Sequence, residues 1–152
     1  MSYAEAIFDL LDADAPLAAV LTGGIYNGRG VPEEGINRED YPDAYDSNGL
    51  LQPVAVVRGR RVVPDQAFRV VEAQFVAVNQ VVEIWFYDDK DSGWDTIESA
   101  GQLVYELLQD QQISGAYNCK LVNSIEEERD PDLGGACLHR LDFQVTGRKQ
   151  PA

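Results

Sequence analysis

The stretch YDDKDSGWDTIESA, residues 87–100, has the residue types and the spacing that come nearest to a metal site. It places a glycine among four aspartates, which are Asp88, Asp89, Asp91 and Asp95. A calcium loop of the EF-hand kind needs oxygen ligands at positions 1, 3 and 5, glycine at position 6 and glutamate at position 12. Counted from Asp89, position 6 is Trp94 and position 12 is Ala100, so the pattern is not met.

The same acids have a structural explanation at the start of a helix. Asp91 or Ser92 can cap a helix that begins near Trp94, and acids in the first turn of a helix favour the positive end of its dipole. The sequence therefore predicts that this stretch turns the chain into a helix, and the remaining alternative is a weak, adventitious cation site.

Other candidate catalytic groups are isolated from one another. His139 could serve as a general base, but it falls on the apolar face of a predicted strand, which favours a hydrogen-bonded core or interface residue. No serine lies beside a histidine or within a GxSxG elbow, and the glycine pairs at 23–24 and 134–135 lack the patterns that cradle phosphate. No catalytic, cofactor or metal site is predicted, so we expect a protein that is not an enzyme.

The charge balance is the strongest compositional feature of this 152-residue chain. Its net charge is −14, from 12 lysines and arginines against 26 aspartates and glutamates. Tight binding to nucleic acid depends on cations that displace counterions from phosphates, so a DNA-gripping role is disfavoured. An acidic protein can still surround DNA if its task is to let DNA slide without sticking.

Length and hydropathy predict one folded domain over residues 1–152. The apolar runs are far shorter than the ~20 residues that cross a bilayer, and the acid-bearing N-terminus is not typical of a signal peptide. Cys119 and Cys137 have no CxxC spacing and are predicted to be buried free thiols in a reducing compartment.

Hydrophobic periodicity predicts the order helix, strands, helix, hairpin. Helices are expected over residues 3–12, 16–21 and 94–110, and strands over 25–27, 52–59 and 69–87, the last bent near 79–80 or split in two. Two C-terminal strands follow, one with Cys119, Leu121, Asn123 and Ile125 on a face, the other with Cys137, His139, Leu141, Phe143 and Val145. This pattern indicates a single α+β domain, a mainly antiparallel β-sheet with helices packed on one face and a C-terminal β-hairpin.

Two segments favour contacts outside the domain. Residues 28–51 form a long polar loop with no apolar period, and such a loop is more readily ordered when something outside the domain holds it. The basic stretch RGRR supplies Arg58, Arg60 and Arg61, with Arg69 nearby. It is either a solvated strand end or a contact with an acidic partner, including another copy of this chain.

The order of elements resembles that of the tail terminator (tail completion) proteins of long-tailed bacteriophages. The resemblance covers about residues 4–147 and includes an N-terminal helix, a variable polar loop and the extended strand QPVAVV. Its most telling part is a strand that ends in EIWFYDD, followed by the helix GWDTIESAGQLVYELL and a closing hairpin.

The resemblance implies a structural virion protein without enzymatic activity, cofactor or membrane. Members form a ring, usually of six subunits, on the last ring of the tail-tube protein, where they stop tube growth and offer a surface to the head connector. DNA passes through the central hole without sequence-specific binding. The implied location is the tail or neck of the virion, and the host cytoplasm during assembly.

Closed rings use head-to-tail interfaces, so one surface of each subunit must complement a different one. The candidate basic side of such an interface is Arg58, Arg60, Arg61 and Arg69. The candidate acidic side is the neighbour's residues 33–46 or 88–95, with Glu33, Glu34, Asp40, Asp43, Asp89 and Asp91.

Three alternatives remain open at this stage. One is another head–tail connector component, an adaptor or stopper. The second is a small hydrolase or cation-dependent enzyme that uses Asp89, Asp91 and His139. The third is a host regulatory module that binds a protein partner through residues 28–51.

Overall fold

The computed structural model describes residues 3–31, 35–64, 76–116 and 118–149. The helices are α1 (Tyr3–Asp12), α2 (Ala15–Val20) and α3 (Asp95–Leu108). The strands are β1 (Ile25–Asn27), β2 (Val54–Gly59), β3 (Val63–Pro64), β4 (Val76–Asp88), β5 (Asn118–Asp130) and β6 (Ala136–Lys149). Short 3-10 turns lie at η1 (Gly28–Gly30), η2 (Pro42–Ala44), η4 (Ile113–Gly115) and η5 (Pro131–Leu133).

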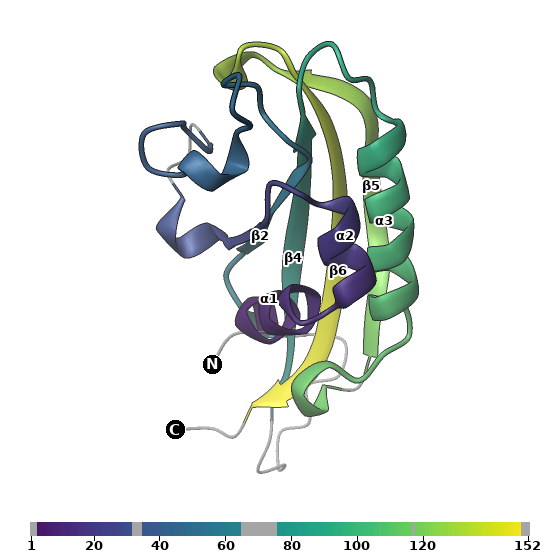
Figure 1. Cartoon of the computed structure of the whole chain (residues 1–152). Coiled ribbons are helices and arrows are strands. Elements are labelled where there is room, and N and C mark those ends of the chain that lie inside the picture. The colour runs from purple at the N-terminus through teal and green to yellow at the C-terminus, as the bar shows by residue number, and fades with distance from the viewer. Residues whose placement is uncertain (1–2, 32–34, 65–75, 117, 150–152) are drawn as a thin grey trace.

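The strands form one sheet in the order β1-β2-β4-β6-β5, and β3 pairs with β4. β1 runs parallel to β2, whereas the other pairs are antiparallel. The three helices pack on one face of this sheet, and β5 and β6 form the C-terminal hairpin (Figure 1). The predicted α+β domain with a mainly antiparallel sheet is therefore confirmed.

The helices begin and end close to the predicted positions. α1 buries Ile7 and Leu11, one turn apart, and Asp14 caps α2 by accepting a hydrogen bond from the Leu17 N–H at 3.0 Å. The prediction that Asp91 or Ser92 caps α3 is wrong, because the N-cap is Trp94 and it makes no side-chain capping bond. No helix in the described part of the chain is long and apolar enough to cross a membrane.

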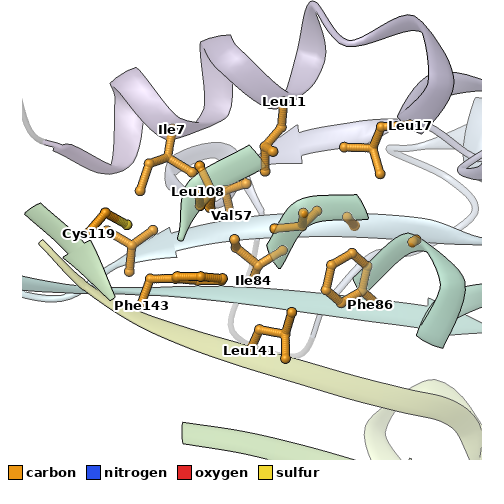
Figure 2. Packing of buried hydrophobic residues seen from close by; sticks show 14 of the residues in the cluster. Ile7, Leu11, Leu17, Val57, Ile84, Phe86, Leu108, Cys119, Leu141 and Phe143 are labelled. Atoms are coloured by element: carbon orange, nitrogen blue, oxygen red, sulfur yellow. The ribbon is translucent and has the colours of Figure 1, made fainter. Parts of the chain in front are cut away.

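The main core lies between the helices and the sheet (Figure 2). Because side chains alternate between the two faces of a strand, Val82, Ile84 and Phe86 of β4 all point toward the helices. Their cross-strand neighbours Leu141 and Phe143 on β6 complete the floor on which the helices rest. This apolar face of β4 is thus the face that holds the domain together.

The long polar loop is anchored to the sheet from within the domain, and its contact with an outside partner stays a prediction. Three of its apolar residues, Val31, Ile36 and Ala44, are buried against the sheet face opposite the helices. There they pack on a second cluster formed by Val54, Val56, Tyr87 and Leu138. A few well-placed apolar side chains are enough to fix a segment that has no hydrophobic period.

Two strands differ from the sequence pattern. β4 is one continuous strand that pairs with β6 from Val76 to Asp88, with no bend at Asn79 and Gln80; residues 69–75 of the predicted strand lie outside the described part. β5 contains register shifts between Leu121 and Asn123 and between Ile125 and Glu128. The predicted shared face of β5 is therefore wrong beyond Leu121, since a bulge reverses the alternation of side chains.

Gly101 allows α3 to approach the sheet closely over His139. A Cβ atom at this position would lie 2.6 Å from the Nε2 atom of His139, closer than nonbonded atoms approach. The imidazole is buried there and packs on Phe86, with ring centroids 5.6 Å apart. The spacing between α3 and β6 thus depends on the missing side chain.

We predict that Gly101→Val lowers the free energy of unfolding by about 1–3 kcal/mol, the usual cost of overpacking a filled core. Ser99→Val is the matched control, since it adds the same branched side chain on the exposed side of α3 and is expected to change stability by less than about 0.5 kcal/mol. Urea unfolding measures both. His139→Ala should restore part of the loss in the Gly101→Val background, and equal effects at positions 99 and 101 would contradict the packing argument.

Candidate functional site

The acidic turn that follows β4 uses its carboxylates to hold its own backbone. Asp88 Oδ1 accepts the Asp89 N–H at 2.8 Å, and Asp89 Oδ2 accepts the Asp91 N–H at 3.1 Å. Burial raises the pKa of Asp88 above its ordinary value. In the described residues no group of three His, Cys, Asp or Glu side chains is arranged to hold a metal ion. The turn directs the chain from β4 into α3, as predicted.

The other side chains that could take part in a reaction lie in the core. His139 is 4% exposed, and burial lowers its pKa, an effect that the charge of Glu126 partly offsets. Cys119 and Cys137 are both buried and free, as predicted, and burial raises the pKa of Cys119 to about 12. These groups are kept neutral and away from solvent, which is the opposite of what nucleophilic or acid–base chemistry needs.

The sheet face opposite the helices, called the outer face below, carries a polar row across four strands. The register places Arg58 of β2 opposite Glu83 of β4, Glu83 opposite Asp142 of β6, and Asp142 opposite Asn123 of β5. Two carboxylates that lie directly opposite each other repel, so this row needs compensating charge.

Arginine side chains supply that charge by lying over the carboxylates. Arg60 pairs with Glu83, whose other oxygen accepts the Trp85 indole N–H at 3.1 Å. Arg140 pairs with Asp142 at 3.0 Å, and its guanidinium carbon lies 4.8 Å from the centre of the Trp85 ring. The result is a polar surface in which each of the two buried carboxylates is paired with an arginine.

An open groove of about 860 Å³ crosses the outer face and gathers arginines from distant parts of the chain. Beside Arg58, Arg60 and Arg61 it is lined by Arg29 and Arg129, together with Glu5, Glu83, Asp130 and Asp132. Sequence reasoning missed Arg29 and Arg129, because only the order of strands in the sheet brings them near the RGRR stretch.

Most arginines of the groove already have partners within the chain. Arg29 pairs with Glu5, and Arg129 donates to the carbonyls of Lys90 and Gly135 while lying 4.9 Å from the Trp94 ring centre. In contrast, the exposed Arg61 forms no ion pair with any described residue. Within the described part of the predicted patch, Arg61 thus has charge to offer a partner.

Of the predicted acidic residues, Asp89 and Asp91 lie at the other end of β4 from the site where Arg60 is bound. Asp40 and Asp43 are exposed on the long loop, and Asp89 and Asp91 follow the end of β4. The Arg60 N–H bonds to the carbonyl of Val81, seven residues before Asp88. At a rise of about 3.3 Å per residue, the two ends are about 23 Å apart. Arg69, Glu33 and Glu34 lie outside the described residues.

Comparisons with known proteins establish the fold alone. No protein-family model and no curated protein matches the sequence. Among solved structures, the chain is similar to a chain in the virion of a native gene transfer agent particle, with a TM-score of 0.59 and 16% sequence identity. The match covers 96% of this chain and 94% of that chain, so the likeness extends over nearly the whole of both.

We predict that Arg60→Ala lowers the free energy of unfolding by about 1 kcal/mol, because the buried Glu83 loses its ion pair with Arg60. The value is small since the Arg60 side chain is itself 61% exposed. Arg61→Ala, one residue away, is the control and should stay within about 0.5 kcal/mol of wild type. Thermal unfolding compares the two. Glu83→Gln should recover part of the Arg60→Ala loss, and no recovery would contradict the pairing.

We predict a pH dependence that comes from His139. The pKa of His139 in the folded chain lies below the ordinary 6.5, so the unfolded chain protonates this imidazole more readily. The contribution of the neutral, buried imidazole to the free energy of unfolding is therefore lost as pH falls through 6.5. The difference in melting temperature between wild type and His139→Gln should therefore shrink as pH falls from about 7.5 to about 5. A difference that stays constant over this interval would show that His139 does not titrate in a buried site.

Proposed function

We propose that this chain is a structural protein of a phage-like virion and acts as the tail terminator of its neck. The observation that carries the proposal is the likeness in fold, over 96% of the chain, to a chain of a gene transfer agent virion. The order of elements adds to it, since β4, the acidic turn, α3 and the closing hairpin follow the order typical of tail terminator proteins.

In this proposal the chain forms a ring, usually of six copies, on the end of the tail tube. The ring ends tube polymerisation and joins the tail to the head connector, while DNA passes through its lumen. The net charge of −14 supports this role, because an acidic lumen repels phosphates and lets DNA slide. The outer face and its charge-matched row offer a fixed surface for a neighbouring protein.

The chemistry of the described residues supports a role in assembly. The carboxylates near β4 are used within their own turn, and His139 and both thiols are buried. The chain is therefore proposed to work without catalysis or cofactor, in the host cytoplasm during assembly and then in the virion. Its proposed partners are its own copies, the tube protein and the connector.

Tube assembly in vitro tests this function. The tube protein of the same particle is allowed to polymerise with and without the purified chain, and tube lengths are measured by electron microscopy. We expect the chain to shorten tubes and to cap their ends as a ring. As a control, His139→Gln is expected to retain capping, because the substitution lies beneath α3 in the core.

The same experiment separates the other connector roles. A chain that leaves tube length unchanged but joins finished tubes to heads would be an adaptor or stopper, and the terminator role would be wrong. A chain that neither caps tubes nor joins them to heads would contradict a place in the neck.

A further inference from the structure

The two ends of β2 carry segments of opposite charge, and each displays an apolar side chain. The acidic tip, residues 46–50, precedes the strand and contains Asp46 and Leu50. The basic tip, residues 60–62, follows the strand and contains Arg61 and Val62. Leu50 is 50% exposed and Val62 37%, and in the described residues only Leu10 and Val122 are other large apolar side chains with comparable exposure.

The acidic tip is a closed turn that presents Leu50 in a fixed position. Asp46 Oδ1 accepts the N–H groups of Asn48 and Leu50 at 2.9 and 3.0 Å, and the Asp46 N–H donates to the Leu50 carbonyl at 2.9 Å. Gly49 adopts a φ of +79°, and because it has no side chain the guanidinium of Arg38 lies against it. A tip that is already ordered loses little entropy when a partner binds.

A hollow of about 370 Å³ lies beside Leu50 and is lined by carboxylates. Asp46, Asp88 and Asp89 contribute from two separate segments, and Leu51 and Pro53 supply apolar wall. Among the described residues no lysine or arginine lines this hollow. The nearby Arg38 lies against Gly49, and Lys90 lines an adjoining hollow. The hollow therefore combines negative charge with an apolar rim.

The basic tip has the complementary chemistry and is also held in place. The Arg60 N–H donates to the Val81 carbonyl at 2.9 Å, and the Arg60 carbonyl accepts from the Gln80 side chain at 2.7 Å. The Arg60 guanidinium is already paired with Glu83. The next two residues, Arg61 and Val62, are thus presented outward from an anchored backbone as one cation and one apolar side chain.

We propose that the basic tip of one copy seats in the acidic hollow of the next, with the Arg61 guanidinium against Asp46 and Asp89 and Val62 against Leu50. The inference rests on the proposed ring and names the surfaces that close it. Because the tips lie about 23 Å apart on each subunit, they meet only between copies. Two different surfaces that meet head-to-tail generate a ring or a filament, whereas one surface that meets itself stops at a dimer.

Cysteine cross-linking in the presence of tube protein tests this contact. Leu50→Cys and Val62→Cys are made in separate chains, mixed and oxidised, then alkylated before unfolding. The native thiols do not interfere, since Cys119 and Cys137 are buried. We expect dimers of one Leu50→Cys and one Val62→Cys chain, at several-fold higher yield than from mixtures of either variant with Val122→Cys. The last is the matched control, because Val122 is as exposed as Leu50 but lies on β5.

The charge of Arg61 is tested in the same assay. Arg61→Glu in the Val62→Cys chain should lower the cross-linked yield several-fold, whereas Arg61→Lys should keep it. Raised salt should lower the yield from the parent pair, since the contact is between exposed charges.

Each outcome decides between the contact and the function. Suppose that the chain caps tubes but Leu50→Cys and Val62→Cys cross-link to each other no better than to Val122→Cys, or that each variant cross-links mainly with copies of itself. The contact is then wrong and the proposed function stands. If the pair cross-links but tubes are not capped, the contact stands and the terminator role is wrong. If neither occurs, both are wrong.

Discussion

The antiparallel pairing of β4 with β6 is the constraint on which the rest of the structure depends. All 13 residues of β4 have a partner on β6, so the two strands share one register from end to end. That register decides which side chains face the helices and which face outward, and a slip of one residue would exchange the two sets. Ile84 and Phe143 would then meet water, and Glu83 and Asp142 would enter the core.

The two faces made by this pairing are stabilised in different ways. The helix face is an apolar core, and its close contacts depend on positions such as Gly101. The outer face holds two buried carboxylates at adjacent register positions, each covered by an arginine. Replacing such ion pairs by apolar side chains often leaves the free energy of unfolding unchanged or raises it. The two ion pairs therefore serve mainly to hold the side chains of the outer face in fixed positions. A face organised in this way is suited to meeting another protein in one orientation.

The sequence predicted the features that depend on local pattern. The helix and strand order and the burial of both cysteines follow from periodicity and residue type. The internal anchoring of the loop was not predicted, because Ile36 and Ala44 have no apolar neighbours at a regular spacing, although each is buried. The bulges of β5 cannot be seen in the alternation of apolar and polar residues along the sequence, so Asn123 was assigned to the wrong face of the strand. The groove is also lined by Arg29 and Arg129, and only the order of strands in the sheet shows that they lie near the RGRR stretch.

The high pKa of Cys119 has a consequence for the covalent structure of the chain. Oxidation and disulfide exchange proceed through the thiolate, and a thiol with a pKa of about 12 is almost entirely protonated near neutral pH. The second thiol, Cys137, is also buried, and burial raises its pKa as well. Both thiols should therefore oxidise slowly, and storage without reductant should leave Cys119 and Cys137 in the free form.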